Sequence, residues 1–532
     1  MSHAQLRAIG PASPHVRRLI TLASLGILLT ALGVMTFVAL RTPLKDDIAW
    51  LLYVARRWMT GRELYVDVVE VNPPLIVWVS AIPLQLAAWL DIDPQFIAMP
   101  FFIALVLGCA SGAATLLRPF GPVFKDRIPV FATIGTVLLV IPAGDLGQRE
   151  HLLVAAMLPY LVLFARSLEG KRPGVLLSVL SGILAGLGCA LKPRYAGVFL
   201  TLELLALTRG LRPWRALPLA AGVTMAGYAG LVVLICPAYV NRAVPLAVAL
   251  YGATDVPFIS LLLDSARLLF GEAVAIALCW LSWRRLPERN LLLTMLVFAV
   301  TSTMICFVDG KDWFYHRLPA TVVTILALIC WAVSLLVHRA PEERGARLPV
   351  IAAAIALLVF LVGAFQRIQP ELATAVTPER STVARLEELV RQEHAHTYVA
   401  FSEWLALGFP VVNNTGVSWA SRFDSMWALK GELWRARFDP TTASEWPIRR
   451  WVTHDFIAGC PDLAVVDTRE SVNYLAVLTA SDPAFARVWT QYRKIASFDG
   501  LDVYRRTTGG CINPWVAAES KVAALDPRHK MK

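Results

Sequence analysis

The sequence predicts a polytopic α-helical membrane protein with about eleven transmembrane helices and a small C-terminal extracytoplasmic α/β domain. Three observations lead to this fold class. The 532-residue chain is 57% hydrophobic and 17% charged, whereas charged residues make up about a quarter of an ordinary soluble domain. Its apolar residues gather into runs long enough to cross a bilayer. After residue 366 these runs stop, and a mixed polar and apolar pattern begins.

Eleven apolar runs account for the predicted spans. Some are shorter than the ~20 residues of a straight span, so their ends must extend into neighbouring polar residues. A twelfth run, residues 75–90, decides the topology, because every later loop changes side if this run also crosses. The eleven runs are residues 19–40, 96–117, 128–143, 151–164, 175–191, 195–207, 216–236, 259–283, 291–308, 318–337 and 348–365.

The Lys and Arg clusters between the runs predict the orientation. With residues 75–90 at the interface or re-entrant, six basic loops fall on the cytoplasmic side, as the positive-inside rule requires. The N-terminus is then cytoplasmic and the C-terminal region lies outside. The net charge of +11 is explained by these basic loops, which set the orientation and contact anionic lipid headgroups. The sequence has no basic face interleaved with aromatic residues that would indicate a nucleic-acid partner. The six loops are residues 15–18, 118–127, 166–172, 209–215, 283–289 and 338–347.

Two domains follow from the change of pattern: residues 1–366 as the transmembrane module and residues 367–532 as an extracytoplasmic mixed α/β domain. Cys460 and Cys511 fall in the second domain, where an oxidising compartment favours a disulfide; free thiols are the alternative. Local patterns in this domain predict one amphipathic helix, two strands and one hairpin around an Asp-Gly turn. These elements are residues 378–394, 397–401, 463–466 and 495–504.

The strongest chemical signal lies just after the first apolar run. Asp46 and Asp47 are adjacent carboxylates at the edge of a membrane span, where charges are costly unless they are solvated or used. A carboxylate near a phosphate-linked sugar can act as a general base on an acceptor hydroxyl. The alternative is that both are ordinary charges at the end of a span.

Three further outer loops carry positive charge that the positive-inside rule does not explain, and a phosphate ligand is the natural explanation. Each loop also has a structural alternative. Glu150 favours a helix N-terminus, the Lys192–Arg194 pair can snorkel to the interface, and the aromatic residues around Trp313 suit an interfacial belt. The candidate residues are Arg149, Glu150, His151, Lys192, Arg194, Lys311, Tyr315, His316 and Arg317.

Taken together, these loops resemble those of C-type (GT-C) glycosyltransferases, which use polyprenyl-phosphate sugars. The closest likeness is to the protein O-mannosyltransferase and aminoarabinose transferase branch, and it covers roughly the first 320 residues. The shared pattern is an acidic pair after the first span, a short helix, a Gly-x-x-x-Tyr-x-Asp-like turn, and a Pro-Pro-Leu segment followed by a Trp. Here these elements are Asp46-Asp47, residues 48–60, Gly61 with Tyr65 and Asp67, Asn72-Pro73-Pro74-Leu75, and Trp78.

The resemblance implies a role for each candidate residue. Asp46 would be the base, and Asp47 would orient substrate or hold a divalent cation. Many relatives have Glu at the position of Asp47, and this difference leaves open which of the two acids is the base. Substrate contacts are implied for Tyr65, Asp67, Trp78, Arg149, Glu150 and His151. In many relatives an Asp stands at the position of Glu150. Donor-phosphate contacts are implied for Lys192, Arg194, Lys311, Tyr315, His316 and Arg317.

The function implied is a membrane glycosyltransferase in a bacterial inner membrane. It would transfer a sugar from a polyprenyl-phosphate donor to a hydroxyl of a lipid, glycan or protein acceptor on the periplasmic side, in cell-envelope glycan or glycolipid biosynthesis. The alternative is a transporter or lipid-linked sugar flippase, which should carry ionisable groups deep in its spans. Glu203 and Asp264 are the intramembrane candidates, and most of the predicted spans have none.

Overall fold

The computed structural model describes residues 14–338 and 347–507. The chain divides into two compact units, each built from segments far apart in the sequence. The helical unit comprises Met1–Leu40, Phe96–Gly230 and Val256–Ala373, and the mixed unit comprises Arg41–Gln95, Leu231–Asp255 and Thr374–Lys532. The division predicted at residues 366 and 367 stays a prediction, and the mixed unit includes two segments from the first half of the chain.

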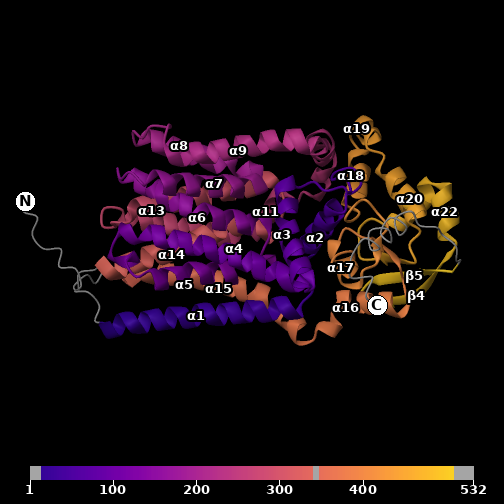
Figure 1. The fold of residues 1–532 in the computed structure, drawn as a ribbon, viewed down its shortest axis with the longest axis horizontal. Helices are drawn as coiled ribbons and strands as arrows, with labels where there is room; N and C mark the ends of the chain where they lie inside the picture. Colours follow the sequence, from indigo (N-terminus) through magenta and orange to yellow (C-terminus); the bar gives the residue numbers. More distant parts are fainter. Residues whose placement is uncertain (1–13, 339–346, 508–532) are drawn as a thin grey trace, which may run out of the picture. The chain divides into compact units, whose positions relative to one another are not determined.

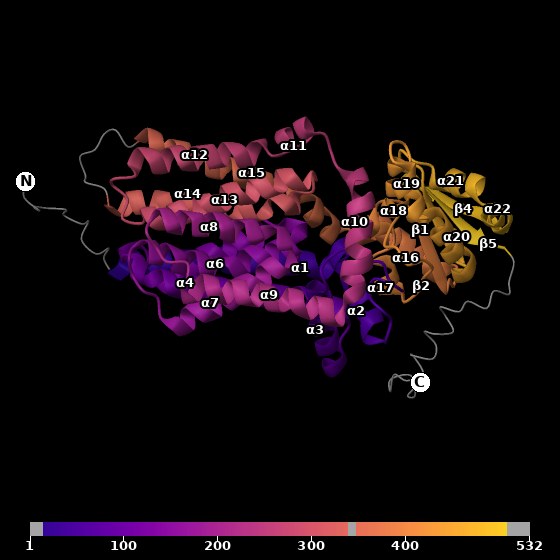
Figure 2. The same cartoon turned by 90° about the horizontal axis from the view of Figure 1, so that it is seen from above.

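Seven helices among the described residues are long and apolar enough to cross a membrane, or eight if the bent pair Tyr239–Thr254 and Phe258–Asp264 forms one span. The protein is therefore a multi-pass membrane protein. Figures 1 and 2 show the long helices of the helical unit running side by side. The seven are α1 (Pro14–Arg41), α4 (Pro94–Leu117), α6 (Arg149–Leu168), α9 (Ala216–Ile235), α13 (Arg289–Asp309), α14 (Phe314–His338) and α15 (Arg347–Val376).

The difference from the predicted eleven spans lies in short helices. The predicted run 259–283 is wrong as a single span, because it is broken at Ser265 into α11 and α12. Each of the other runs corresponds to a helix, but α5 and α7 have only 14 and 17 residues. At 1.5 Å per residue they rise less than the ~30 Å of a hydrocarbon core. The remaining helices of the unit are α5 (Arg127–Val140), α7 (Val175–Leu191), α8 (Ala196–Thr208), α11 (Phe258–Asp264) and α12 (Ala266–Ser282).

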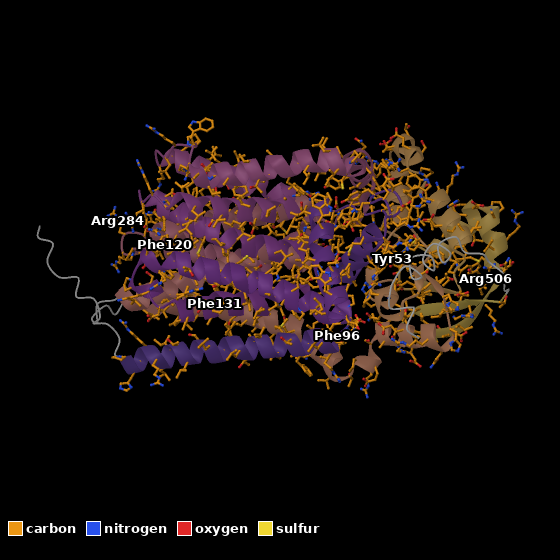
Figure 3. The ribbon with its side chains drawn as sticks, viewed as in Figure 1. Tyr53, Phe96, Phe120, Phe131, Arg284 and Arg506 are labelled. Atoms are coloured by element: carbon orange, nitrogen blue, oxygen red, sulfur yellow. The ribbon has the colours of Figure 1, made fainter. Side chains whose placement is uncertain are left out.

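Helix α6 forms the centre of the helical unit, since almost every residue from Arg149 to Ala165 is buried. It packs against α7, α13 and α14. Figure 3 labels Phe120 and Arg284 at one end of this bundle and Phe96 toward the opposite end. The basic loops that contain Phe120 and Arg284 therefore share one end of the helical unit.

The mixed unit begins with two helices, α2 (Asp46–Met59) and α3 (Pro74–Leu90), which pack against each other. Residues 231–255 add the π-helical turn η5 (Tyr239–Ala243), α10 (Val244–Leu250) and η6 (Tyr251–Thr254). Helix α3 is the run whose crossing decides the topology, and its 17 residues place it among the shorter apolar helices.

A five-stranded mixed sheet forms the core of the C-terminal part of this unit, in the order β2-β1-β3-β5-β4. Strands β2, β1 and β3 are parallel, and β5 runs antiparallel to both β3 and β4. The register pairs Val399 with Ala464 and Val465 with Val503. The strands are β1 (Thr397–Phe401), β2 (Ser418–Trp419), β3 (Leu463–Asp467), β4 (Tyr492–Phe498) and β5 (Leu501–Arg506).

Helices surround this sheet (Figure 2). Four of them begin with a side-chain cap: Ser381, Asp439, Asn473 and Asp482 each accept a hydrogen bond from a backbone N–H of the first turn, which satisfies an otherwise orphaned donor. The helices are α16 (Thr382–Gln392), α17 (Val411–Thr415), α18 (Trp427–Arg435), α19 (Pro440–Glu445), α20 (Ile448–Gly459), α21 (Tyr474–Ser481) and α22 (Pro483–Trp489).

The local predictions for this region are confirmed. The amphipathic helix is α16, the two strands are β1 and β3, and the hairpin is β4–β5. Asp499 and Gly500 both have positive φ, 51° and 73°, as a two-residue type I′ turn requires. Cys460 is buried at the end of α20, whereas Cys511 lies outside the described residues, so their disulfide stays a prediction.

Candidate functional site

Asp46 and Asp47 are the first two residues of α2 in the mixed unit. Carboxylates are favoured there by the partial positive charge of a helix N-terminus. The Asp46 Oδ1 atom accepts a hydrogen bond of 2.9 Å from the Asp47 backbone N–H and lies 3.5 Å from Lys45 Nζ. Burial raises the pKa of Asp46, Lys45 opposes this shift, and the charge of Asp47 adds to it. A carboxylate with a raised pKa holds a proton more readily, as a general base must.

Tyr65 and Asp67 shape the turn that follows α2. Tyr65 has a φ of 67°, and its hydroxyl donates to the Asn72 carbonyl at 2.8 Å. The Asp67 carboxylate accepts from the Glu63 backbone N–H at 2.9 Å. Both side chains bond to backbone of their own turn, so the structure gives them a positioning role. Trp78 lies half-buried in α3.

Glu70 is a residue that the sequence analysis did not single out. Its side chain is 3% exposed, and Oε2 accepts from Trp50 Nε1 at 2.5 Å. The other oxygen, Oε1, accepts from the backbone N–H and the side-chain Nδ2 of Asn72, at 2.6 and 2.5 Å. Glu70 therefore ties helix α2 to the segment before the two prolines.

The C-terminal part of the mixed unit adds a further carboxylate beside this segment. The backbone N–H of Val69 donates to the Arg422 carbonyl at 2.8 Å, and Asp424 follows two residues later. The Asp424 carboxylate accepts from Trp427 Nε1 at 2.8 Å. Burial first, then the charges of Glu70 and Asp47, raise the pKa of Asp424 to about 7. Sequence spacing alone does not mark this position, although Asp424 is one of the acids of the outer domain that could meet substrate.

The basic candidates lie in the helical unit, where two of the three loops meet at the start of α6. Arg149, Glu150 and His151 open this helix and are all buried. Lys192, between α7 and α8, places its Nζ 2.8 Å from Glu150 Oε1. Burial lowers the pKa of Lys192, Glu150 opposes the shift, and Arg149 adds to it. His151 Nδ1 accepts from the Gly147 backbone N–H at 3.1 Å, so this ring braces the helix start.

Asp309, the last residue of α13, joins the second and third basic loops. One of its oxygens pairs with Arg194, and the other lies 2.9 Å from His316 Nδ1. The Tyr195 hydroxyl donates to the His316 carbonyl at 3.4 Å. Asp309 is not among the residues predicted from the sequence; its position at the end of an apolar run, directly before Gly310, was the available signal.

Aromatic side chains cover this third loop. The rings of Trp313 and Tyr315 stack with centroids 5.8 Å apart, and the His316 ring lies 4.8 Å from that of Tyr315. Lys311 is 4% exposed, and its Nζ lies 6.0 Å from the Trp313 centroid. Arg317 NH2 donates to the Asp312 carbonyl at 2.6 Å, while its buried Nε and NH1 have no hydrogen-bond partner among residues 14–338 and 347–507.

These contacts make one basic cluster in the helical unit, formed by Arg149, Lys192, Arg194, Lys311 and Arg317. The first four lie within electrostatic range of the His316 imidazole, and the fifth is its neighbour in the chain. Glu150 pairs with Lys192 and Asp309 pairs with Arg194, and both carboxylates are buried. Burying positive charge is costly unless it is paired, and the buried Nε and NH1 of Arg317, which have no partner within the described residues, are available to an anionic ligand.

The described side chains do not form a metal site by themselves. In the part of the chain that the structure describes, no group of three or more His, Cys, Asp or Glu side chains has the arrangement of a metal site. Asp47 and its neighbours thus do not form such a group by themselves. A divalent cation held with the help of substrate oxygens stays a prediction.

No protein-family model matches the chain, and no curated protein matches its sequence. Its structure is similar to the crystal structure of ArnT from Cupriavidus metallidurans bound to undecaprenyl phosphate. The match has a TM-score of 0.51 and 14% sequence identity, and it covers 94% of this chain and 100% of that chain. The protein therefore has the fold of ArnT, an aminoarabinose transferase of the GT-C type.

Proposed function

We propose that the protein is a membrane glycosyltransferase that moves a sugar from a polyprenyl-phosphate donor to an acceptor hydroxyl. The observation that carries the proposal is the basic cluster: five cationic side chains gathered around Glu150, Asp309 and His316. ArnT, which shares the fold, binds undecaprenyl phosphate in its crystal structure. A lipid phosphate would supply the anion that the cluster favours.

The basic cluster would hold the donor phosphate and stabilise it as a leaving group. Arg317 offers two buried N–H groups that have no partner among residues 14–338 and 347–507, and guanidinium groups match phosphate oxygens through paired hydrogen bonds. The pKa of Lys192, lowered by burial, returns toward its ordinary value when a phosphate adds negative charge nearby. Such fixed charges stabilise the charge that develops on the phosphate oxygen in the transition state.

The acidic pair of the mixed unit would supply the base. Asp46, or Asp47 in its place, takes the proton of the acceptor hydroxyl while the acceptor oxygen bonds to the anomeric carbon. The bond from that carbon to the phosphate oxygen breaks, and the polyprenyl phosphate leaves with the electron pair. A single displacement of this kind inverts the anomeric centre. Glu70 and Asp424 would then position the acidic pair and its substrate.

The proposal also includes the membrane topology of the chain. Eleven spans, with the short helices extended by flanking residues, would place the N-terminus in the cytoplasm and the C-terminal domain in the periplasm of a bacterial inner membrane. The basic loops that contain Phe120 and Arg284 share one end of the helical unit, as the positive-inside rule expects of cytoplasmic loops. The transmembrane module would carry the phosphate site, and the acceptor would be a lipid, a glycan or a protein.

One observation favours the alternative of a transporter or flippase. Glu272 in α12 is 5% exposed and accepts a hydrogen bond of 2.7 Å from the Thr303 hydroxyl of α13. The sequence analysis did not include it among the intramembrane acids, and a buried membrane carboxylate is a common feature of ion and substrate pathways. A transporter would move labelled lipid-linked sugar across proteoliposomes without cleaving it.

Release of polyprenyl phosphate by purified protein, offered a panel of polyprenyl-phosphate sugars and acceptors, tests the proposal. We expect Lys192→Gln and Arg317→Gln to raise the donor KM on the order of tenfold each, because each removes a charge-assisted contact. Arg284→Gln, at the opposite end of the bundle, is the matched control and should leave KM unchanged. Equal effects of all three substitutions would contradict the assigned phosphate site, and movement of intact donor without release would favour the transporter.

A further inference from the structure

A second pair of arginines lies on the helical unit, outside the basic cluster. Arg267 is near the start of α12, and Arg367 is near the end of α15. Arg367 belongs to the same end of the unit as the basic cluster, because its guanidinium carbon lies 3.5 Å from the ring centroid of Phe314, the first residue of α14. The mechanism proposed above uses neither arginine.

The two guanidinium groups converge on one glycine. A Cβ atom built on Gly363 would lie 3.2 Å from Arg267 NH1 and 3.7 Å from Arg367 NH1. The absence of a side chain at residue 363 therefore lets both cations rest side by side against α15. Like charges this close repel each other, and an anion placed between them would remove that repulsion.

The hydrogen bonds of this pair go to neutral groups. Arg267 NH2 donates to Gln366 Oε1 at 2.7 Å, and Arg367 NH2 donates to the Ile141 carbonyl at 2.9 Å. Within the described residues, neither guanidinium is in an ion pair. The charges within electrostatic range of Arg367 are those of Asp145, Arg267 and Arg317, and the Asp145 carboxylate has the largest effect of the three.

The exposed residues around the arginine pair are apolar, as on a lipid-facing surface. Phe365 and Val362 on α15 are 62% and 45% exposed, and Phe270 on α12 is 44% exposed. In a multi-pass membrane protein such side chains face acyl chains. Helix α15 has 30 residues, about 45 Å at 1.5 Å per residue, which exceeds the ~30 Å hydrocarbon core. Arg367, nine residues before its end, therefore falls near the polar interface.

We propose that Arg267 and Arg367 form a second anion site, which binds the phosphate headgroup of a membrane lipid whose acyl chains lie along α12 and α15. Two adjacent guanidinium forks suit a phosphomonoester, which carries close to two negative charges near neutral pH, better than a singly charged diester. The site does not depend on the proposed sugar transfer, because its ligand is held and not converted.

Lipid binding by the full-length protein in detergent tests this site. Native mass spectrometry would measure dissociation constants for phosphatidic acid, phosphatidylglycerol and phosphatidylcholine, and thermal shift would test inorganic phosphate. The variants are Arg267→Gln alone and together with Arg367→Gln, with Arg284→Gln as the matched control, an exposed arginine at the opposite end of the bundle. Arg267→Gln keeps the test open if the double variant does not fold, because the Arg267 side chain is exposed.

We expect phosphatidic acid to bind most tightly, and its dissociation constant to rise on the order of tenfold per arginine removed, with no change in the control. Three results would overturn the site. These are unchanged phosphatidic acid binding in both variants, an equal loss in Arg284→Gln, and stabilisation by inorganic phosphate without any preference for the lipid.

Discussion

At the scale of single residues, buried carboxylates organise both candidate clusters. Asp309 holds Arg194 with one oxygen and His316 with the other, so one side chain fixes two of the predicted phosphate ligands. Glu70 plays the same part for Trp50 and Asn72 in the mixed unit. Removing Glu70 would leave the buried indole N–H of Trp50 without this partner, which typically costs ~1–3 kcal/mol.

Asp424 makes stability depend on pH. Burial and the charges of Glu70 and Asp47 raise its pKa from 3.8 to about 7, so the folded protein holds this proton more tightly than the unfolded chain. The stabilisation is present below about pH 4 and is lost as pH rises through about 7. Its size is on the order of 2 kcal/mol, because the partial exposure of the side chain screens the full shift.

Replacing Asp424 by Asn tests this linkage. The amide resembles the protonated acid, so we expect Asp424→Asn to melt close to wild type at pH 4 and above wild type at pH 8. Thermal unfolding of the purified protein between pH 4 and pH 8.5 measures the difference. Parallel pH curves for the two proteins would show that Asp424 does not take up a proton on folding in this range.

The sequence pointed to charged residues of the candidate clusters but not to their partners. Asp46, Lys192, Arg194 and Arg317 stood out because charges beside membrane spans are costly. Glu70 and Asp309 did not, since nothing local marks a carboxylate whose hydrogen-bond donors come from distant segments. The role of Tyr65 also needed coordinates, because only its left-handed φ and its bond to Asn72 show that it shapes the turn.

At the scale of elements, close packing of α7 on α9 depends on two glycines one turn apart. A Cβ atom on Gly182 would lie 2.6 Å from the Leu217 carbonyl oxygen, and one on Gly186 would lie 2.8 Å from that of Ala221. These contacts are with backbone, which cannot move aside as a flexible side chain can. Small residues four apart let membrane helices approach closely in this way.

We therefore expect Gly182→Ala to lower the free energy of unfolding by about 1–3 kcal/mol, the usual effect of overpacking. Gly227→Ala on α9 is the matched control, because a Cβ there would meet no atom within 4 Å. Unfolding of both variants in detergent, followed by tryptophan fluorescence, measures the difference. A Gly182→Ala protein as stable as the control would contradict the close approach of the two helices.

Local pattern was a good guide to elements. Ten of the eleven apolar runs each correspond to one helix, and the run 259–283 is divided between α11 and α12. The Asp499-Gly500 dipeptide marked the hairpin, since its positive φ values suit few other residue pairs. The lengths of the helices were harder to predict, because a run of apolar residues does not reveal where its helix ends. Helices α5 and α7, for example, are shorter than full spans. The sheet order β2-β1-β3-β5-β4 depends on pairings between distant strands, which no local pattern encodes.

At the scale of the whole molecule, composition alone was enough to predict a multi-pass membrane protein. The assembly of the mixed unit was not predictable in the same way. Residues 41–95 precede the C-terminal region by some 300 positions, yet Trp50 packs on Phe409 with centroids 4.9 Å apart, and Asn413 donates to the Ala49 carbonyl at 3.0 Å. Contacts of this kind are set by tertiary packing, so the acidic pair shares its unit with the C-terminal sheet.

The most direct test of the proposed function is donor turnover by wild type, Asp46→Asn and Asp47→Asn. Purified protein would receive a polyprenyl-phosphate sugar and an acceptor, and released polyprenyl phosphate would be measured, with thermal unfolding as the check on folding. We predict a loss of at least about a hundredfold in kcat in one of the two variants, in keeping with the contribution of general base catalysis. Full turnover in both folded variants would contradict the carboxylate mechanism.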